Sequence, residues 1–201
     1  MARLAPLTPA DLDTDQQRLY HDITAGPRGQ GARPFGLADE AGALVGPFNA
    51  MLLRPVLGTA LQGLGAAIRY QGLLPARVRE LAILVVAAHW TCEFEQYAHE
   101  AAGRAAGLTE ADLASIRGGG VPDLADAAER AAVRAAWALV RTGDLDEGEY
   151  AETVAALGAD GVFELTTLAG YYATLALQLR VFRVSAPQPP AQPGQGGQRA
   201  G

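Results

Sequence analysis

Apolar residues recur along the chain at the three- and four-residue spacing of α-helices. The clearest helix is expected over residues 76–88, where Pro75 marks the start and an unbroken apolar run covers residues 81–88. A second helix is expected over residues 92–106 and ends at Gly107. Weaker patterns predict further helices at residues 8–25, 47–53, 56–70, 109–117, 123–141, 146–157 and 161–182.

No segment alternates apolar and polar residues as a half-buried strand would, so the predicted fold class is all-α, a helical bundle. Residues 1–44 are expected to form an N-terminal helix and loop extension, and residues 45–184 the helical domain. Residues 185–201 are rich in Pro, Gln and Gly with little to bury, which predicts a disordered C-terminal tail.

Composition narrows the possible partners. The chain has 201 residues, 49% of them hydrophobic, and a net charge of −6, so it can bury one core and lacks the clustered cations that bind nucleic acid. The longest apolar run, residues 81–88, is far below the roughly 20 residues that cross a bilayer. The first residues lack a continuous apolar segment, so we expect no secretory signal, no membrane and a cytoplasmic location.

Two residue types restrict the chemistry. Every cation of the chain is an arginine, and without lysine a Schiff base with pyridoxal phosphate is excluded. Cys92 is the single cysteine, so no intramolecular disulfide can form, and a lone cysteine suits a reducing compartment.

The candidate chemistry lies around this cysteine. On one helix Cys92 and His99 are seven residues apart, nearly two turns, and Glu95 lies between them on the same face. Glu80 stands on the preceding helix at the edge of the apolar run, where a carboxylate is partly buried and in need of a partner. Two carboxylates and a histidine are the ingredients of general acid–base catalysis.

Ordinary interpretations of these residues remain open. Glu and His at helical spacing are more often a solvated pair, and a lone buried cysteine is more often a small apolar side chain. His89, Glu95 and His99 could hold a metal, but they form no recognised zinc motif and we expect none.

The segment from Pro75 to Gly107 resembles the core motif of the carboxymuconolactone decarboxylase / alkylhydroperoxidase D family. That motif has an Arg-Glu pair before an apolar helix, then a helix centred on Cys with a following His, then an Ala-Gly ending. The upstream segment 47–52 and the downstream Gly170-Tyr171-Tyr172 also resemble the family, so the likeness covers about residues 45–184. It implies an alkylhydroperoxidase D-like bundle that assembles as a homo-oligomer, a trimer or a multiple of trimers, with a dimer as the alternative.

The resemblance also implies roles for single residues. In the alkylhydroperoxidase D branch a Glu and a His relay protons to a Cys-x-x-Cys dithiol, and Glu80, Cys92 and His99 match the Glu, first Cys and His. Glu95 stands where the second, peroxide-attacking Cys would be, so the dithiol cycle is not available.

The decarboxylase-like branch needs neither metal nor organic cofactor and acts on small carboxylated or lactone-type acids. For this chain it implies a lyase that uses acid–base catalysis, with Glu80, Cys92, Glu95 and His99 at the catalytic site. His89, Arg79 and Tyr97 are the expected substrate-binding residues, and Arg69 or Arg77 could replace Arg79 as the carboxylate anchor. A one-cysteine thiol peroxidase or redox protein and a non-catalytic binding protein are the alternatives.

Overall fold

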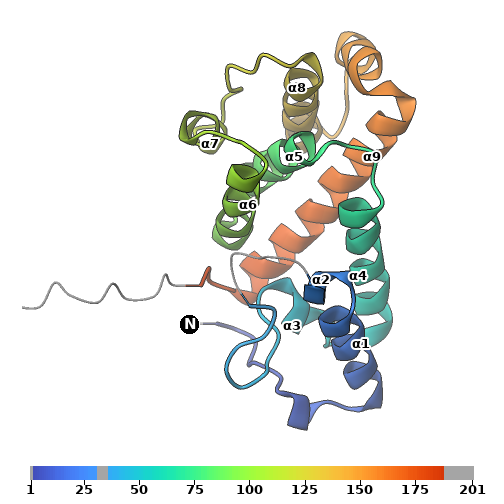
Figure 1. Ribbon diagram of the computed structural model, residues 1–201, viewed down its shortest axis with the longest axis vertical. Coiled ribbons are helices and arrows are strands. Elements are labelled where there is room, and N and C mark those ends of the chain that lie inside the picture. Colours follow the sequence, from blue (N-terminus) through green and yellow to red (C-terminus); the bar gives the residue numbers. More distant parts are fainter. Residues whose placement is uncertain (1, 31–35, 188–201) are drawn as a thin grey trace, which may run out of the picture.

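The computed structural model describes residues 2–30 and 36–187, and the chain is all-α over these residues (Figure 1). A short 3₁₀ helix, η1 (Pro9–Asp11), precedes the α-helices, which are α1 (Thr14–Ala25), α2 (Pro27–Gln30), α3 (Pro47–Met51), α4 (Pro55–Tyr70), α5 (Ala76–His89), α6 (Glu93–Ala105), α7 (Glu110–Arg117), α8 (Ala127–Thr142) and α9 (Glu147–Phe182). In the described residues the only β-type pairing is an isolated bridge between Ala38 and Leu44. None of the described helices is long and apolar enough to cross a membrane.

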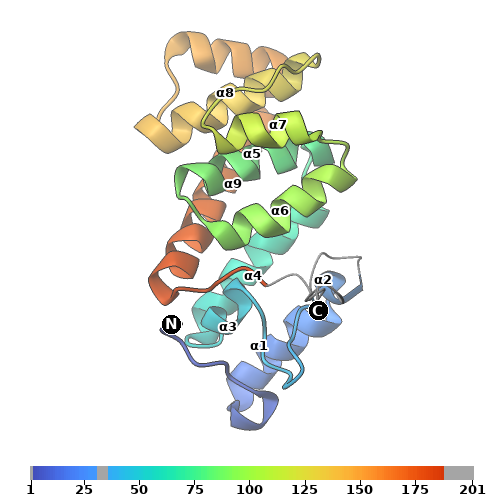
Figure 2. The same cartoon turned by 90° about the vertical axis from the view of Figure 1, so that its left-hand side faces the viewer.

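Helix α5 forms the centre of the bundle because almost every residue after its first turn is buried. Val78 and all residues from Glu80 to Ala87 are buried, and α5 packs against α6, α7, α8 and α9. A helix that is apolar on all sides must be surrounded by other helices. Figures 1 and 2 show this arrangement, with α6, α7 and α8 grouped around α5 and the long α9 passing beside them.

The two helices predicted near the C-terminus are joined into α9, with a break at Gly158. Gly158 has φ 73° and ψ 168°, a conformation that only glycine adopts readily, so the chain changes direction there without leaving the helical path for long. The expected boundary between residues 157 and 161 is therefore present as a kink. The segment after the kink passes beside α5 (Figure 1). Tyr171 and Tyr172 lie on this segment and are buried.

The N-terminal segment differs from its prediction. A single helix over residues 8–25 is wrong, because Asp13 accepts hydrogen bonds from the backbone N–H groups of Asp15 and Gln16 and so starts α1 afresh. Leu19 and Ile23 of α1 are buried in the same core cluster as Leu52 and the residues of α5. The proposed boundary at residue 44 stays a prediction, as does the disordered tail, of which residues 188–201 lie outside the described part.

The turn between α5 and α6 also differs in detail. The helix was expected from residue 92, but Cys92 occupies the cap position with φ −96° and ψ 96°, and α6 begins at Glu93. Thr91 instead has φ 49° and closes the end of α5, where the N–H of Cys92 bonds to the carbonyl of Ala87. At this cap position Cys92 packs with Phe94 and with Ala176 and Leu179 of α9.

Candidate active site

A buried ion pair joins α5 to α6 at the candidate site. Nδ1 of His99 lies 2.6 Å from Oε2 of Glu80, and the two residues are only 7% and 2% exposed. Glu80 belongs to the first turns of α5 and His99 to the middle of α6, so two neighbouring antiparallel helices bring them together (Figure 2). A buried carboxylate needs such a partner, as the sequence led us to expect.

Glu95 completes a chain of three groups. Its Oε2 lies 3.3 Å from Nε2 of His99, one helical turn further along α6, and Glu95 is only 4% exposed. The His99 ring therefore bridges two carboxylates, with one ring nitrogen facing Glu80 and the other facing Glu95. The predicted convergence of Glu80, Glu95 and His99 is present in the structure.

Both ends of the Glu80–His99 pair are held in their charged forms. Burial alone would lower the pKa of His99, but the charge and hydrogen bond of Glu80, together with Glu95, outweigh it and raise that pKa to about 9. Burial alone would raise the pKa of Glu80, but His99, Arg69 and Arg79 together lower it below its usual value. At neutral pH the site thus holds an imidazolium between carboxylates.

The arginines named from the sequence have separate roles. Arg69 of α4 and Arg79 of α5 each lie 3.7 Å from Oε1 of Glu80, so both add positive charge beside the carboxylate that holds His99. Arg77 instead pairs with Glu129 at 2.6 Å and also donates to the carbonyl of Gly107. These contacts tie the start of α5 to neighbouring elements and leave Arg77 a structural residue.

Two tyrosines of α9 extend the polar interior beyond His99. The ring of Tyr172 packs edge-on to His99 at 5.0 Å between centroids, and its hydroxyl hydrogen-bonds with Arg69. Tyr171 packs edge-on to Tyr172 and hydrogen-bonds with Arg28 of α2. Burial raises the pKa of Tyr171 to about 12 and that of Tyr172 higher still, so both hydroxyls remain neutral donors at any physiological pH.

Cys92 lies next to the Glu80–His99–Glu95 cluster, but its side chain packs in a separate small group of apolar residues. The residue is 2% exposed and packs with Phe94, Ala176 and Leu179, apart from the main core. Burial raises the pKa of the Cys92 thiol to about 11, and the Glu95 carboxylate acts in the same direction, against the opposing backbone N–H groups of Glu95 and Phe94. The thiol is therefore protonated at neutral pH, which makes it a slow nucleophile.

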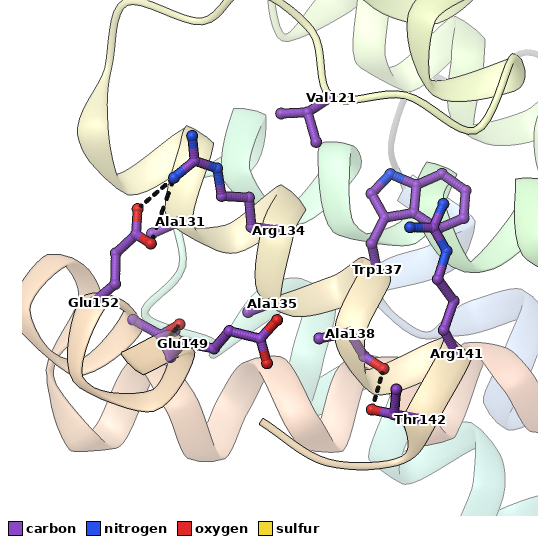
Figure 3. A pocket seen from close by; sticks show the side chains of 11 residues that line it. Val121, Ala131, Arg134, Ala135, Trp137, Ala138, Arg141, Thr142, Glu149 and Glu152 are labelled. Atoms are coloured by element: carbon purple, nitrogen blue, oxygen red, sulfur yellow. Dashed lines mark hydrogen bonds and ion pairs between the residues drawn. The ribbon is translucent and has the colours of Figure 1, made fainter. Parts of the chain in front are cut away.

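A pocket elsewhere in the molecule does not coincide with this cluster. It has a volume of about 340 Å³ and lies between α8 and the segment of α9 before the kink (Figure 3). The Arg134–Glu152 ion pair stands at one end of it, and the Arg141 guanidinium covers the Trp137 ring at the other. None of the residues that line it belongs to the Glu80–His99–Glu95 cluster.

Part of the sequence matches the model of a known protein family. Residues 55–138, from the start of α4 into α8, match the model of the Carboxymuconolactone decarboxylase family. The match covers 84 of the 201 residues, so this part of the chain carries the sequence pattern of that family. The matched segment contains Glu80, Cys92, Glu95 and His99. No curated protein matches the chain.

Solved structures with the same fold agree with the family. An uncharacterized peroxidase-related protein with an alkylhydroperoxidase AhpD core, from Ralstonia eutropha JMP134, is 14% identical with a TM-score of 0.72, over 93% of each chain. The apo debrominase Bmp8 is 15% identical with a TM-score of 0.67, over 90% of each chain. A cysteine-to-alanine variant of that debrominase, in complex with 2,3,4-tribromopyrrole, gives a TM-score of 0.69 at 14% identity, over 93% of this chain and 94% of the other. At such identities these likenesses establish the alkylhydroperoxidase D-like fold alone.

Two of the residues expected to bind substrate lie away from the cluster. His89 is exposed at the far end of α5, about 13 Å along the helix axis from Glu80 by the rise per residue. Tyr97 is half-buried and stands two positions from both Glu95 and His99, which places it on the other side of α6. Arg79 alone of the three lies at the cluster.

Two residues near the cluster, Tyr171 and Tyr172, had no role assigned from the sequence. The hydroxyl groups of Tyr171 and Tyr172 reach the interior from α9, more than 70 positions after His99. The family resemblance had singled out this Tyr-Tyr pair without giving it a role. Periodicity alone marks both residues as core, and only the three-dimensional structure shows that the Tyr172 ring contacts His99 and that its hydroxyl reaches Arg69.

Among the described residues, no group of three His, Cys, Asp or Glu side chains is placed to hold a metal ion. Glu80, His99 and Glu95 instead bond to one another in a line.

Proposed function

We propose that this protein is a cofactor-independent lyase of the decarboxylase type, which acts by general acid–base catalysis on a small carboxylated or lactone-type substrate. The single observation that supports this most is the buried Glu80–His99–Glu95 chain. An acid and a base held side by side in a desolvated site are what proton transfer to and from carbon requires.

In this proposal His99 is the proton donor. When the bond between carbon and a substrate carboxylate breaks, carbon dioxide leaves and its electron pair passes to the remaining carbon framework. The imidazolium of His99 supplies the proton that quenches this pair, and solvent returns it. The pKa of about 9 keeps His99 protonated at neutral pH, and the Glu80 carboxylate 2.6 Å away holds the ring in one orientation.

Glu95 is the carboxylate that faces the substrate. Glu80 is already surrounded by His99, Arg69 and Arg79, whereas the Glu95 carboxylate has one ion-pair partner within the described residues, His99. Glu95 is therefore the group that is available to carry the proton of the ring on to the substrate carbon, and solvent then restores the proton of the ring. The presence of a carboxylate at the position of the second Cys in the peroxidase branch supports acid–base rather than redox chemistry.

The thiol-peroxidase alternative finds less support. A peroxide is attacked by a thiolate, and the Cys92 thiol is buried with a pKa of about 11. With no second cysteine in the chain, a sulfenic acid on Cys92 has no internal thiol to resolve it.

The proposal includes assembly of the chain into a homo-oligomer. Four large apolar side chains on α4, the turn that follows it and α9 are more than 60% exposed, namely Val56, Leu57, Leu73 and Phe163. Exposed apolar side chains of this size are typical of surfaces that a partner covers. Sedimentation equilibrium of the wild type and of Leu57→Glu tests it: dissociation in the variant supports the assembly, and a monomeric wild type contradicts it.

The activity is tested by a screen of small carboxylated lactones and enol acids for release of carbon dioxide. With a substrate in hand, His99→Gln and Glu95→Gln should lower kcat about 10²- to 10⁴-fold, the usual contribution of a positioned acid or base. Cys92→Ser should keep its activity, and Glu100→Gln, on the same helix but paired with Arg104 and Arg117, is the matched control. Full activity in both His99→Gln and Glu95→Gln, or loss of activity in Cys92→Ser alone, would overturn the proposal.

A further inference from the structure

A pocket of about 210 Å³ opens where the start of α6 meets the end of α9. Figures 1 and 2 both show the C-terminal end of α9 beside the first turn of α6. The pocket is lined by two short stretches of chain, Thr91, Cys92 and Glu93 on one side and Leu179, Arg180, Arg183, Val184 and Ser185 on the other. Its volume suits a small organic molecule.

The charge around this pocket is positive. Arg180 and Arg183 face a single acidic residue, Glu93. Arg180 uses Nη1 to donate to the backbone carbonyls of Trp90 and Thr91, which fixes its guanidinium at the rim. Arg183 has no polar side-chain partner among the described residues. Cations near the C-terminal end of a helix offset its dipole, but this general preference does not require both to border a cavity.

The backbone conformation at the pocket is also unusual. Thr91 and Arg183 are the two non-glycine residues of the described chain with positive φ, at 49° and 54°, and both line this pocket. The equivalent turn at the end of α6 uses Gly107, which takes this conformation without strain. Strained residues of this kind cluster at functional sites, where the side chain is needed in that place.

We propose that Arg180 and Arg183 form a carboxylate-binding subsite that holds an acidic group of the substrate in this pocket. The identity of the anion as the substrate's carboxylate rests on the proposed lyase function. Guanidinium groups suit this task because their planar N–H donors match the two oxygens of a carboxylate. The group that they hold is one that the reaction keeps, since an ion pair stabilises a carboxylate against loss as carbon dioxide. The substrate therefore carries a second acidic group.

The pocket adjoins the acid–base cluster through Cys92. The Cys92 thiol is influenced by the positive charge of Arg180 on one side and the negative charge of Glu95 on the other. A small acid bound to the two arginines thus lies beside Cys92, whose thiol is also within the influence of Glu95. In this arrangement Cys92 lines the pocket and limits how far the bound molecule can extend toward Glu95.

Alkylation of Cys92 by two matched reagents tests the subsite without any known substrate. Iodoacetate carries a carboxylate and iodoacetamide is its neutral counterpart, and Cys92 is the single cysteine that either can label. The ratio of the two rate constants cancels differences in thiol ionisation and access. Relative to the same ratio in the unfolded chain, we expect the folded protein to favour iodoacetate by about three- to fivefold at low salt, as an interaction with exposed guanidinium groups gives. The preference should disappear in 1 M salt, because screening is then nearly complete.

Variants of the pocket decide whether the arginines are the cause. Arg183→Gly removes one charge and also relieves the positive φ, so it should fold at least as well as the wild type yet lose most of the preference. Thr91→Gly relieves the same strain at the same pocket without a change of charge and should keep the preference. Arg180→Gln should lose it, whereas Arg18→Gln, an exposed arginine of α1, should not.

An unchanged ratio in Arg183→Gly, or a wild-type ratio equal to that of the unfolded chain, would overturn the subsite. The same data separate the two proposals. A raised ratio that depends on the arginines, in a protein with no lyase activity on any acid, supports an anion pocket while the lyase proposal fails. Lyase activity with no such ratio overturns the subsite alone.

Discussion

Nδ1 of His99 lies 2.6 Å from Oε2 of Glu80, and this contact joins α5 to α6 inside the bundle. Most buried ion pairs contribute little net stability, because desolvation of both charges offsets their attraction. Here the pair continues to Glu95 and is flanked by Arg69 and Arg79, so five ionisable groups share one interior region. Such a concentration of buried charge is more readily explained by chemistry than by stability.

Glu80→Gln should lower the pKa of His99 from about 9, by about 1–3 pH units, because a contacting opposite charge is removed while the ring keeps its burial. The measurement is an NMR titration of the histidine rings. The chain has two other histidines, His21 and His89, which are exposed and serve as internal references. Glu100→Gln should leave the titration of His99 in place, and a His99 pKa that stays near 9 in Glu80→Gln would show that Glu80 does not hold the proton.

Stability should depend on pH through the same pair. The folded-state pKa of His99 is raised to about 9, above its value in the unfolded chain, so its contribution is complete below about pH 6.5 and is lost as the pH rises through 9. The pKa of Glu80 is lowered on folding, so its contribution is present above its unfolded value and is lost in acid. Urea denaturation of the wild type should therefore show a loss on the order of 2–3 kcal/mol between pH 6.5 and 9.5.

His99→Gln is the variant that isolates this effect. Without a titrating ring at this position, the fall in unfolding free energy between pH 6.5 and 9.5 should largely vanish, although the variant is less stable at pH 6.5. A variant that keeps the full slope would place the titrating group elsewhere, and a wild type whose stability rises over this interval would contradict the raised pKa.

Cys92 should behave as a buried thiol. Its alkylation by iodoacetamide should rise with pH up to about 11, whereas the unfolded chain should level off near the free-thiol value of about 8.5. The peroxide-consumption rates of the wild type and of Cys92→Ser should be equal within error. A folded-state thiol that titrates below the unfolded one, together with peroxide turnover that Cys92→Ser loses, would favour the redox function instead.

Local patterns predicted much of this fold because they act over a few residues. Helices α4, α5 and α7 lie within one or two residues of their expected positions, since their proline and threonine starts and apolar stripes are all local signals. The single helix expected over residues 8–25 is wrong because Asp13 caps a new helix at Thr14, although the apolar pattern shows no break there. The helix expected from residue 123 begins instead at Ala127, where Asp126 caps it.

The site was predictable only where its residues are close in sequence. Glu95 and His99 are one turn apart on α6, and the family motif added Glu80, so their meeting could be foreseen. Cys92 was expected on the same face, but its non-helical φ and ψ turn it toward α9. The contact of Arg180 with the turn before Cys92 spans 90 positions, and no periodicity carries information over that distance.

Two glycines of α4 test whether the polar interior around Tyr171 depends on close packing. A Cβ on Gly65 would lie 2.0 Å from the Tyr171 hydroxyl and 2.6 Å from a guanidinium nitrogen of Arg28, whereas a Cβ on Gly63 would meet nothing within 4 Å. Gly63→Ala should therefore stabilise the protein by up to about 1 kcal/mol through helix propensity. Gly65→Ala should destabilise it by about 1–3 kcal/mol because the helix is already tightly packed there.

The two substitutions are the same change on the same helix two residues apart, so their difference isolates packing from propensity. Urea denaturation gives both free energies. If Gly65→Ala also separates Arg28 from Tyr171, a burial-dependent change in tyrosine absorbance should accompany it, and Gly63→Ala should show none. Equal stabilisation by both variants would mean that Tyr171 and Arg28 can move aside freely. Tyr171, which packs on the Tyr172 ring beside His99, would then not be held in place by α4.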